Sequence, residues 1–265
     1  MAKQTIDFAK LIQEDREQRQ QQHWQGTFIE YLEKVKDDAS QANLSHRRLH
    51  DMIDGVGLTE INPESDPKVQ RLFGDEPIKT YNFFRDEFFG MERTLDKIVR
   101  YFHAAAMGGE ESRQVLYLMG PVGSGKSSLV ERLKRGLEEL QPIYVIDGCP
   151  INEQPLHLIP RHLRPAFEEM LGVKIEGDLC PVCRYRLMEE FGGRYEEVPI
   201  RTVSFSKRGR RGIGVVPPVD PNNQDTSVLI GSEDISKLDR FSEGDPRVLE
   251  LNGAFNVGNR GMVEF

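Results

Sequence analysis

The chain has few cysteines and no long apolar run, and each of these absences excludes a class of protein. Three of the 265 residues are cysteine, an odd number that does not suit the disulfide framework of a secreted domain. No apolar run approaches the ~20 residues that a membrane-spanning helix needs. Residues 1–5 also lack the apolar core of a secretory signal. We therefore expect a cytoplasmic protein with reduced thiols and no membrane partner.

A surplus of positive charge is missing as well. Asp and Glu number 43 against 35 Lys and Arg, so the formal net charge is -8 at pH 7. Nucleic-acid-binding domains carry a basic surplus, and the acidic balance therefore argues against DNA or RNA as a partner. With 265 residues, the chain has room for one large or two small domains and for a sizeable core.

The sequence does contain a glycine-rich loop in an informative setting. Residues 115–119 form a short apolar run that predicts a buried strand, and residues 129–133 follow a helical period. The pattern GxxxxGK[ST] lies between them, in the order of strand, loop and helix that a P-loop needs. A chance lysine in a glycine-rich turn is a poor alternative, because all three parts fall in register. The loop comprises Gly120, Pro121, Val122, Gly123, Ser124, Gly125, Lys126, Ser127 and Ser128.

This loop predicts a binding site for the phosphates of ATP. Its glycines let successive backbone N–H groups point at phosphate oxygens, and the following helix presents its positive N-terminus to the same anion. Lys126 is expected to reach the β and γ phosphates. Ser127 is expected to place its hydroxyl on the Mg²⁺ that bridges them.

The first part of the chain predicts helices outside the nucleotide-binding core. Residues 1–55 show apolar spacing typical of helices, interrupted by the wholly polar run 13–22. Residues 54–80 are rich in Gly, Pro, Asp and Glu, as in a linker. We therefore expect a helical N-terminal module with its linker over residues 1–75 and a P-loop domain over residues 76–265. The helix that leads toward the loop is expected to bury Leu95, Ile98, Val99 and Phe102.

An insertion interrupts the core after its second strand. Residues 143–146 predict that strand, and the insertion covers about residues 148–225. Within it, Cys180 and Cys183 have the CxxC spacing at which two thiolates on one turn reach the same tetrahedral ion. Cys149 and His157 supply two further donors. These four residues predict a structural Zn²⁺ site.

The cysteine motif leaves other interpretations open. A single CxxC is also the spacing of a redox dithiol or of two ordinary buried thiols. A redox pair is expected at a helix N-terminus beside a thioredoxin-like strand, and residues 177–179 do not resemble such a strand. His162 is an alternative to His157 as the fourth ligand.

Residues 199–205 and 212–216 predict a β-hairpin, because β-branched residues alternate on both sides of a polar, glycine-containing turn. The turn carries four basic side chains: Lys207, Arg208, Arg210 and Arg211. A solvated tip is the simple interpretation. In a ring-shaped assembly, such a tip would instead face a central channel or a polyanionic partner.

The order of these motifs resembles one family. Residues 88–92 look like the stretch that AAA+ ATPases place against adenine, which implies that Gly90 and Met91 contact the base. Residues 253–265 look like the helix and turn that feed the Walker B strand of AAA+ ATPases of the helix-insert type. Together with the P-loop, the cysteine set and residues 229–235, the whole chain resembles the N-terminal AAA+ part of the PrkA family of bacterial serine protein kinases.

This resemblance implies an α/β fold: a P-loop NTPase core of AAA+ type, with the N-terminal helical module, the inserted Cys-containing lobe and the β-hairpin. It implies binding of Mg-ATP, protein substrates and, for a full-length protein, phosphoryl transfer to serine or threonine. We expect the chain to be an N-terminal fragment that stops inside the Walker B strand. Glu264 then lies too early to act as the hydrolytic glutamate, so no catalytic residue is assigned. The kinase signatures HRDLxxxN and DFG do not occur in the chain.

Two other functions stay open. An AAA+ ATPase that remodels or degrades proteins would turn over ATP as a homo-oligomer and would use the basic turn as a substrate contact. A non-catalytic scaffold would bind ATP without turnover and recruit partners through its N-terminal helices. The sequence leaves the oligomeric state undecided.

Overall fold

The computed structural model describes residues 23–61, 78–217 and 226–265, together with the single positions 8, 13, 16, 70 and 71. The predicted polar run 13–22 lies outside the described residues, apart from Gln13 and Arg16. By its contacts, the chain divides into two compact units. One consists of Met1–Ala42 and Gln141–Phe265, and the other of Asn43–Leu140. The predicted boundary near residue 75 stays a prediction.

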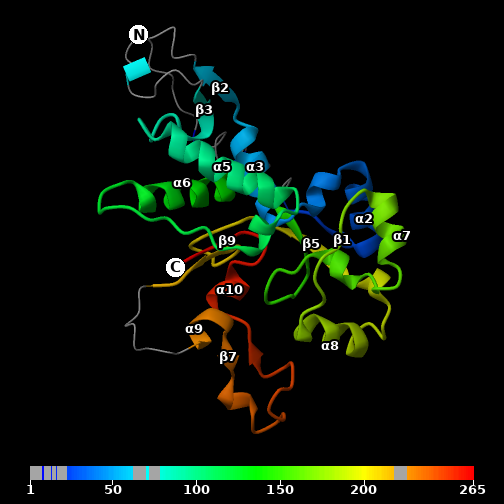
Figure 1. Ribbon diagram of the computed structural model, residues 1–265. Helices are drawn as coiled ribbons and strands as arrows, with labels where there is room; N and C mark the ends of the chain where they lie inside the picture. The colour runs from blue at the N-terminus through cyan, green and yellow to red at the C-terminus, as the bar shows by residue number, and fades with distance from the viewer. Residues whose placement is uncertain are drawn as a thin grey trace. The chain divides into compact units, whose positions relative to one another are not determined.

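The unit Asn43–Leu140 includes the helices α3 (Ser45–Asp54), α5 (Glu92–Ala106) and α6 (Lys126–Glu139) (Figure 1). The periodicity of α5 is confirmed, since Leu95, Ile98, Val99 and Phe102 are all buried. A buried apolar stripe of this kind is what holds a short amphipathic helix in place. The stretch expected as a linker contributes strands β2 (Leu58–Ile61) and β3 (Ile78–Tyr81), which pair antiparallel.

The apolar run before the P-loop differs from its prediction. Residues 115–119 form no strand, and the side chains of Val115, Tyr117 and Met119 are 78%, 80% and 83% exposed. A strand needs a neighbour to receive its backbone hydrogen bonds. In this unit's described residues, β2 and β3 pair only with each other. The prediction of a buried strand is therefore wrong for this structure.

The other unit contains a three-stranded antiparallel sheet in the order β1-β5-β4. Its strands are β1 (Gln25–Thr27), β5 (Pro199–Val203) and β4 (Ile143–Ile146). Strand β4 was predicted, and β5 falls within the predicted strand 199–205. Helix α2 (Phe28–Asp37) follows β1 directly and begins with a capping box between Thr27 and Glu30. The helix buries Phe28, Tyr31 and Val35 in the core of this unit. Helix α2 and the inserted lobe therefore share one core.

The predicted β-hairpin is wrong. A tight turn does close over residues 206–211, where Ser206 and Arg211 exchange backbone hydrogen bonds of 2.9 Å. The flanking strands, however, belong to different sheets. Strand β5 lies between β1 and β4, whereas β6 (Ile213–Val215) pairs in parallel with β9 (Met262–Glu264). Partners distant in the sequence decide the strand pairing here, and the local alternation of side chains carries no information on them.

The remaining elements of this unit are short. Helices α7 (Arg164–Leu171) and α8 (Pro181–Glu189) lie in the inserted lobe, and α10 (Ala254–Val257) precedes β9. The order of helix, turn and strand expected for residues 253–265 is therefore present. The others are α9 (Ser227–Ile230), β7 (Ser232–Glu233) and β8 (Leu249–Glu250). Within the described ranges, no helix has both the length and the apolar character to cross a membrane.

Candidate functional site

The P-loop opens directly into helix α6. Gly123 and Gly125 have φ angles of +81° and +83°, in the left-handed region that favours glycine. Gly125 is the residue that caps the start of α6, and its carbonyl accepts the first helical hydrogen bond from the N–H of Leu129 at 2.9 Å. The loop therefore brings the backbone to the positive end of α6, where an anion is stabilised.

Lys126 lies folded across this loop. Its Nζ donates to the carbonyl oxygens of Gly120 at 2.8 Å and Pro121 at 2.7 Å, and to Oγ of Ser124 at 3.3 Å. The ammonium group therefore sits over the backbone of the loop. A phosphate bound there would have to replace these carbonyl contacts.

The segment that was predicted to face adenine lies against the same loop. A Cβ atom placed on Gly125 would be 3.5 Å from Sδ of Met91 and 3.8 Å from Cε1 of Phe88. Phe88 is buried, whereas Phe89 is 79% exposed. Gly90 has φ +73°, and its N–H donates to Oε1 of Glu92 at 3.1 Å. The adenine contact itself stays a prediction.

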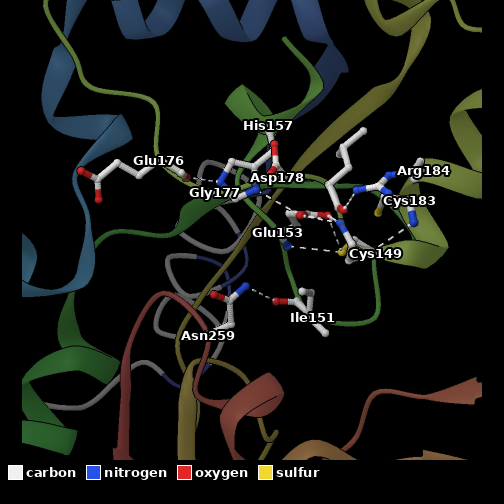
Figure 2. A network of polar contacts seen from close by, with 12 residues as sticks. Cys149, Ile151, Glu153, His157, Glu176, Gly177, Asp178, Cys183, Arg184 and Asn259 are labelled. Atoms are coloured by element: carbon white, nitrogen blue, oxygen red, sulfur yellow. Dashed lines mark hydrogen bonds and ion pairs between the residues drawn. The ribbon is translucent and has the colours of Figure 1, made fainter. Parts of the chain in front are cut away.

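A second cluster of functional groups lies in the other unit (Figure 2). The Sγ atoms of Cys149, Cys180 and Cys183 and a carboxylate oxygen of Glu153 all lie within 4.8 Å of one another, and all four residues are buried. Cys149 and Glu153 come from the turn after β4. Cys180 caps α8 and Cys183 lies in its first turn. These four residues could hold a metal ion.

Backbone N–H groups surround the donor atoms. Sγ of Cys149 accepts from the N–H of Glu153 at 3.4 Å, and Sγ of Cys180 accepts from the N–H of Cys183 at 3.3 Å. The N–H of Cys180 donates to Oε1 of Glu153 at 2.8 Å. The loop that carries Cys149 and Glu153 is itself held by Asn259, whose Nδ2 donates to the carbonyl oxygen of Ile151 at 2.9 Å. The three backbone N–H groups, those of Glu153, Cys183 and Cys180, favour negative charge on the cluster.

The three thiols differ in acidity. Hydrogen bonds from Cys180 and then Cys183 lower the pKa of Cys149 to about 4. The same contacts with Cys149 raise the pKa of the Cys180 and Cys183 thiols. Burial raises the pKa of Glu153. These opposite directions make Cys149 the thiol of the cluster that ionises most readily.

His157 lies beside the cluster, in contact with its carboxylate. Its Nδ1 is 3.0 Å from Oε1 of Glu153, and its Nε2 is 2.7 Å from the carbonyl oxygen of Glu176. The sequence predicted His157 as the fourth donor, whereas the structure brings Glu153 to that place. His162, the alternative, is exposed. The only sequence signal for Glu153 is an acidic residue four positions after Cys149, within a stretch that is otherwise apolar or neutral.

The order of the sequence motifs predicted a family, and comparison with known proteins tests that prediction. Residues 26–265 match the family described as the PrkA AAA domain. The chain belongs to this family. The resemblance to PrkA is thereby confirmed, and membership of an AAA family implies that the domain binds a nucleotide.

Named relatives of this PrkA AAA domain differ in their described activity. The ATP-dependent protease PrkA of Bacillus subtilis (strain 168) is 42% identical over 267 residues, which cover 98% of this chain and 40% of the relative. The serine/threonine kinase YeaG of Escherichia coli (strain K12) is 36% identical over 247 residues, which cover 90% and 38%. The chain therefore spans about two fifths of the length of these relatives. No solved structure matches it.

Proposed function

We propose that this chain is the ATP-binding region of a PrkA protein and that it binds Mg-ATP through residues 120–128. The observation that carries the proposal is the loop geometry: two glycines in the left-handed region lead into α6, with Lys126 folded over the loop. Its backbone N–H groups and the start of α6 would bind the phosphates.

Each side chain of the loop then has a definite role. On binding ATP, Lys126 would exchange the carbonyl oxygens of Gly120 and Pro121 for oxygens of the β and γ phosphates. Ser127 would place its hydroxyl on Mg²⁺. Gly90 and Met91 would contact adenine, which is supported by the proximity of Met91 to the position of Gly125.

Calorimetric titration of the chain with Mg-ATP tests this proposal. Lys126→Ala removes the ammonium group and should abolish measurable binding. Lys97→Ala on α5 is a matched control, since it removes the same charge from an exposed lysine of the same unit. Retained affinity in Lys126→Ala would refute the assignment, and loss of affinity in the control would point to a general charge effect.

For the full-length protein, we propose phosphorylation of serine or threonine in protein substrates, as in the relative named YeaG. One observation favours a second candidate: the relative named as an ATP-dependent protease is 42% identical, against 36% for the kinase. An AAA+ ATPase that degrades or remodels proteins is therefore the alternative. A nucleotide-dependent scaffold without turnover is the third.

A single incubation separates these functions. The full-length protein is mixed with ATP labelled on the γ phosphate and with casein, and casein is then analysed for label and for cleavage. Labelled, intact casein supports the kinase, and casein fragments support the protease. Released phosphate alone supports a remodelling ATPase. Bound ATP without any of these products supports the scaffold.

We also propose that the cysteine cluster is a structural zinc site. Three buried sulfurs and one carboxylate oxygen within 4.8 Å suit a soft, four-coordinate ion. The rival interpretations are a redox dithiol and thiols without a ligand. Metal analysis of protein purified without added zinc tests the proposal: one zinc per chain supports it, and folded, metal-free protein contradicts it.

A further inference from the structure

We propose that Glu153 is the fourth zinc ligand in this cluster and that His157 is a positioning residue, which holds the Glu153 carboxylate and does not bind the metal. This inference rests on the zinc site proposed above and names its ligands. It replaces the predicted set of three cysteines and a histidine by three cysteines and a glutamate.

The distances favour the carboxylate. A tetrahedral zinc ion with Zn–S bonds of about 2.3 Å separates neighbouring sulfurs by about 3.8 Å. The four candidate donor atoms, including the Glu153 oxygen, already lie within 4.8 Å of one another. Shifts of about 1 Å or less would therefore bring these atoms to zinc-binding distances.

The hydrogen bonds of His157 argue against its binding the metal. A backbone carbonyl can only accept, so the contact of Nε2 with the Glu176 carbonyl oxygen requires a proton on Nε2. The other ring nitrogen, Nδ1, faces Oε1 of Glu153 at 3.0 Å. A metal-binding imidazole must offer a free lone pair from one nitrogen. His157 would have to break one of these two contacts to provide it.

Glu153 is fixed for its role from several directions. Its backbone carbonyl accepts from the N–H of Ile146 at 3.1 Å, which attaches it to strand β4. The N–H of Cys180 lies 2.8 Å and 3.1 Å from its two side-chain oxygens. With His157 on Oε1, the carboxylate is held between the two segments that carry the cysteines. Groups that orient a ligand in this way raise metal affinity without touching the metal.

The buried charge also requires these partners. Three thiolates and a carboxylate around a divalent ion leave a surplus of negative charge, and buried charge is costly unless hydrogen bonds compensate it. The N–H groups of Glu153 and Cys183 point at sulfur, and that of Cys180 points at the carboxylate. When His157 carries a proton on Nδ1 as well as on Nε2, its ring donates to Oε1 of Glu153 and extends this shell to the outer side of the carboxylate.

X-ray absorption at the zinc edge of the purified chain tests the ligand set directly. We expect three sulfurs and one oxygen around the metal, without the outer-shell scattering of an imidazole ring. A spectrum with imidazole scattering would overturn the inference while leaving the zinc site intact. Protein without zinc would instead refute the proposed metal site, so the two failures are distinguishable.

Zinc affinity, measured by competition with a chromophoric chelator, tests the two roles separately. Glu153→Gln keeps the shape of the side chain, replaces the anionic donor by an amide and should weaken zinc binding by about a hundredfold or more. His157→Ala should keep one zinc per chain with an affinity lower by about 10- to 100-fold, the usual effect of losing a group that orients a ligand.

His157→Asn provides the rescue, because its amide places an N–H group near the position of Nδ1, and it should recover most of the affinity lost in His157→Ala. His162→Ala is the control, since it removes an exposed histidine of the same lobe. The inference is wrong if Glu153→Gln binds zinc as tightly as the unaltered protein, or if His157→Ala alone loses the metal. Failure of His157→Asn to recover affinity would contradict the positioning role.

Discussion

Lys126 donates from Nζ to the carbonyl oxygen of Pro121 at 2.7 Å, which places the side chain expected on the phosphates over its own loop. The contact lies within a nine-residue segment and depends on the left-handed glycines that curl the backbone. It links the sequence motif to a conformation that can bind an anion.

Gly123→Ala should weaken nucleotide binding and lower stability. Gly123 has φ +81° with no atom within 4 Å of an added Cβ, so the cost comes from the backbone alone, about 1 kcal/mol. The loop would relax this strain by leaving the phosphate-binding conformation. Titration with Mg-ATP and urea unfolding measure the two effects. Gly120→Ala is a control for stability, since Gly120 has no positive φ and an added Cβ would meet the Ser124 hydroxyl at 3.0 Å, the end of a side chain that can rotate. An equal loss of stability there would contradict the argument.

Gly136→Ala should destabilise the unit Asn43–Leu140, although alanine is the better helix former by about 1 kcal/mol. Gly136 lies inside α6, and an added Cβ would stand 2.7 Å from Sδ of Met52 and 2.7 Å from Cζ of Phe83. Overpacking of this kind typically costs about 1–3 kcal/mol. Urea unfolding measures it. In a Phe83→Leu background, the loss should shrink, and an unchanged loss would exclude the ring contact as its cause.

Tyr81→Phe should make the protein less sensitive to alkali. Burial, followed by the charge of Asp96, raises the pKa of Tyr81 to about 12, from an ordinary value of 10. The Tyr81 hydroxyl donates to Oδ1 of Asp96 at 3.1 Å. Because the folded state holds this proton more tightly than the unfolded state, the protonated Tyr81 hydroxyl stabilises the fold. This contribution to the free energy of unfolding is complete below pH 10 and is lost as the pH rises toward 12. The free energy of unfolding, measured across pH 9–12, should therefore fall less steeply in the variant.

Tyr117→Phe removes the hydroxyl of a tyrosine that is 80% exposed, and its stability profile should follow that of the unaltered protein. Absorbance of tyrosinate near 295 nm should show a group that titrates near pH 12 and is missing from Tyr81→Phe. Titration of that group near pH 10 would contradict the assigned burial.

Cys183→Ser should release the metal and lower the melting temperature of the unit that contains the cluster. The proposed ion joins the turn after β4 to the start of α8, and its binding free energy adds to folding stability. Chelator treatment of the unaltered protein should produce a similar fall in melting temperature. The same chelator should have no further effect on Cys183→Ser, and an additional fall would show that the ion is held elsewhere.

The sequence alone determined the features that depend on residues near one another in the chain. The spacing of Leu95, Ile98, Val99 and Phe102 was sufficient for α5, since a helix brings residues three and four apart to one face. The family also followed from the order of motifs, which the match over residues 26–265 confirms. The grouping of Cys149 with Cys180 and Cys183 was predicted too, because CxxC places two donors on one turn.

Only the tertiary structure decided which distant segments meet. Strand β5 pairs with β1 and β4, and β6 pairs with β9. The alternation of side chains along β5 and β6 fitted a hairpin between these two strands equally well. The Glu153 carboxylate lies beside the three cysteine sulfurs, and the His157 ring contacts Glu153, although the sequence predicted His157 as the ligand. Strand pairing and donor sets are both fixed by contacts between residues far apart in the chain, which local periodicity and spacing do not encode.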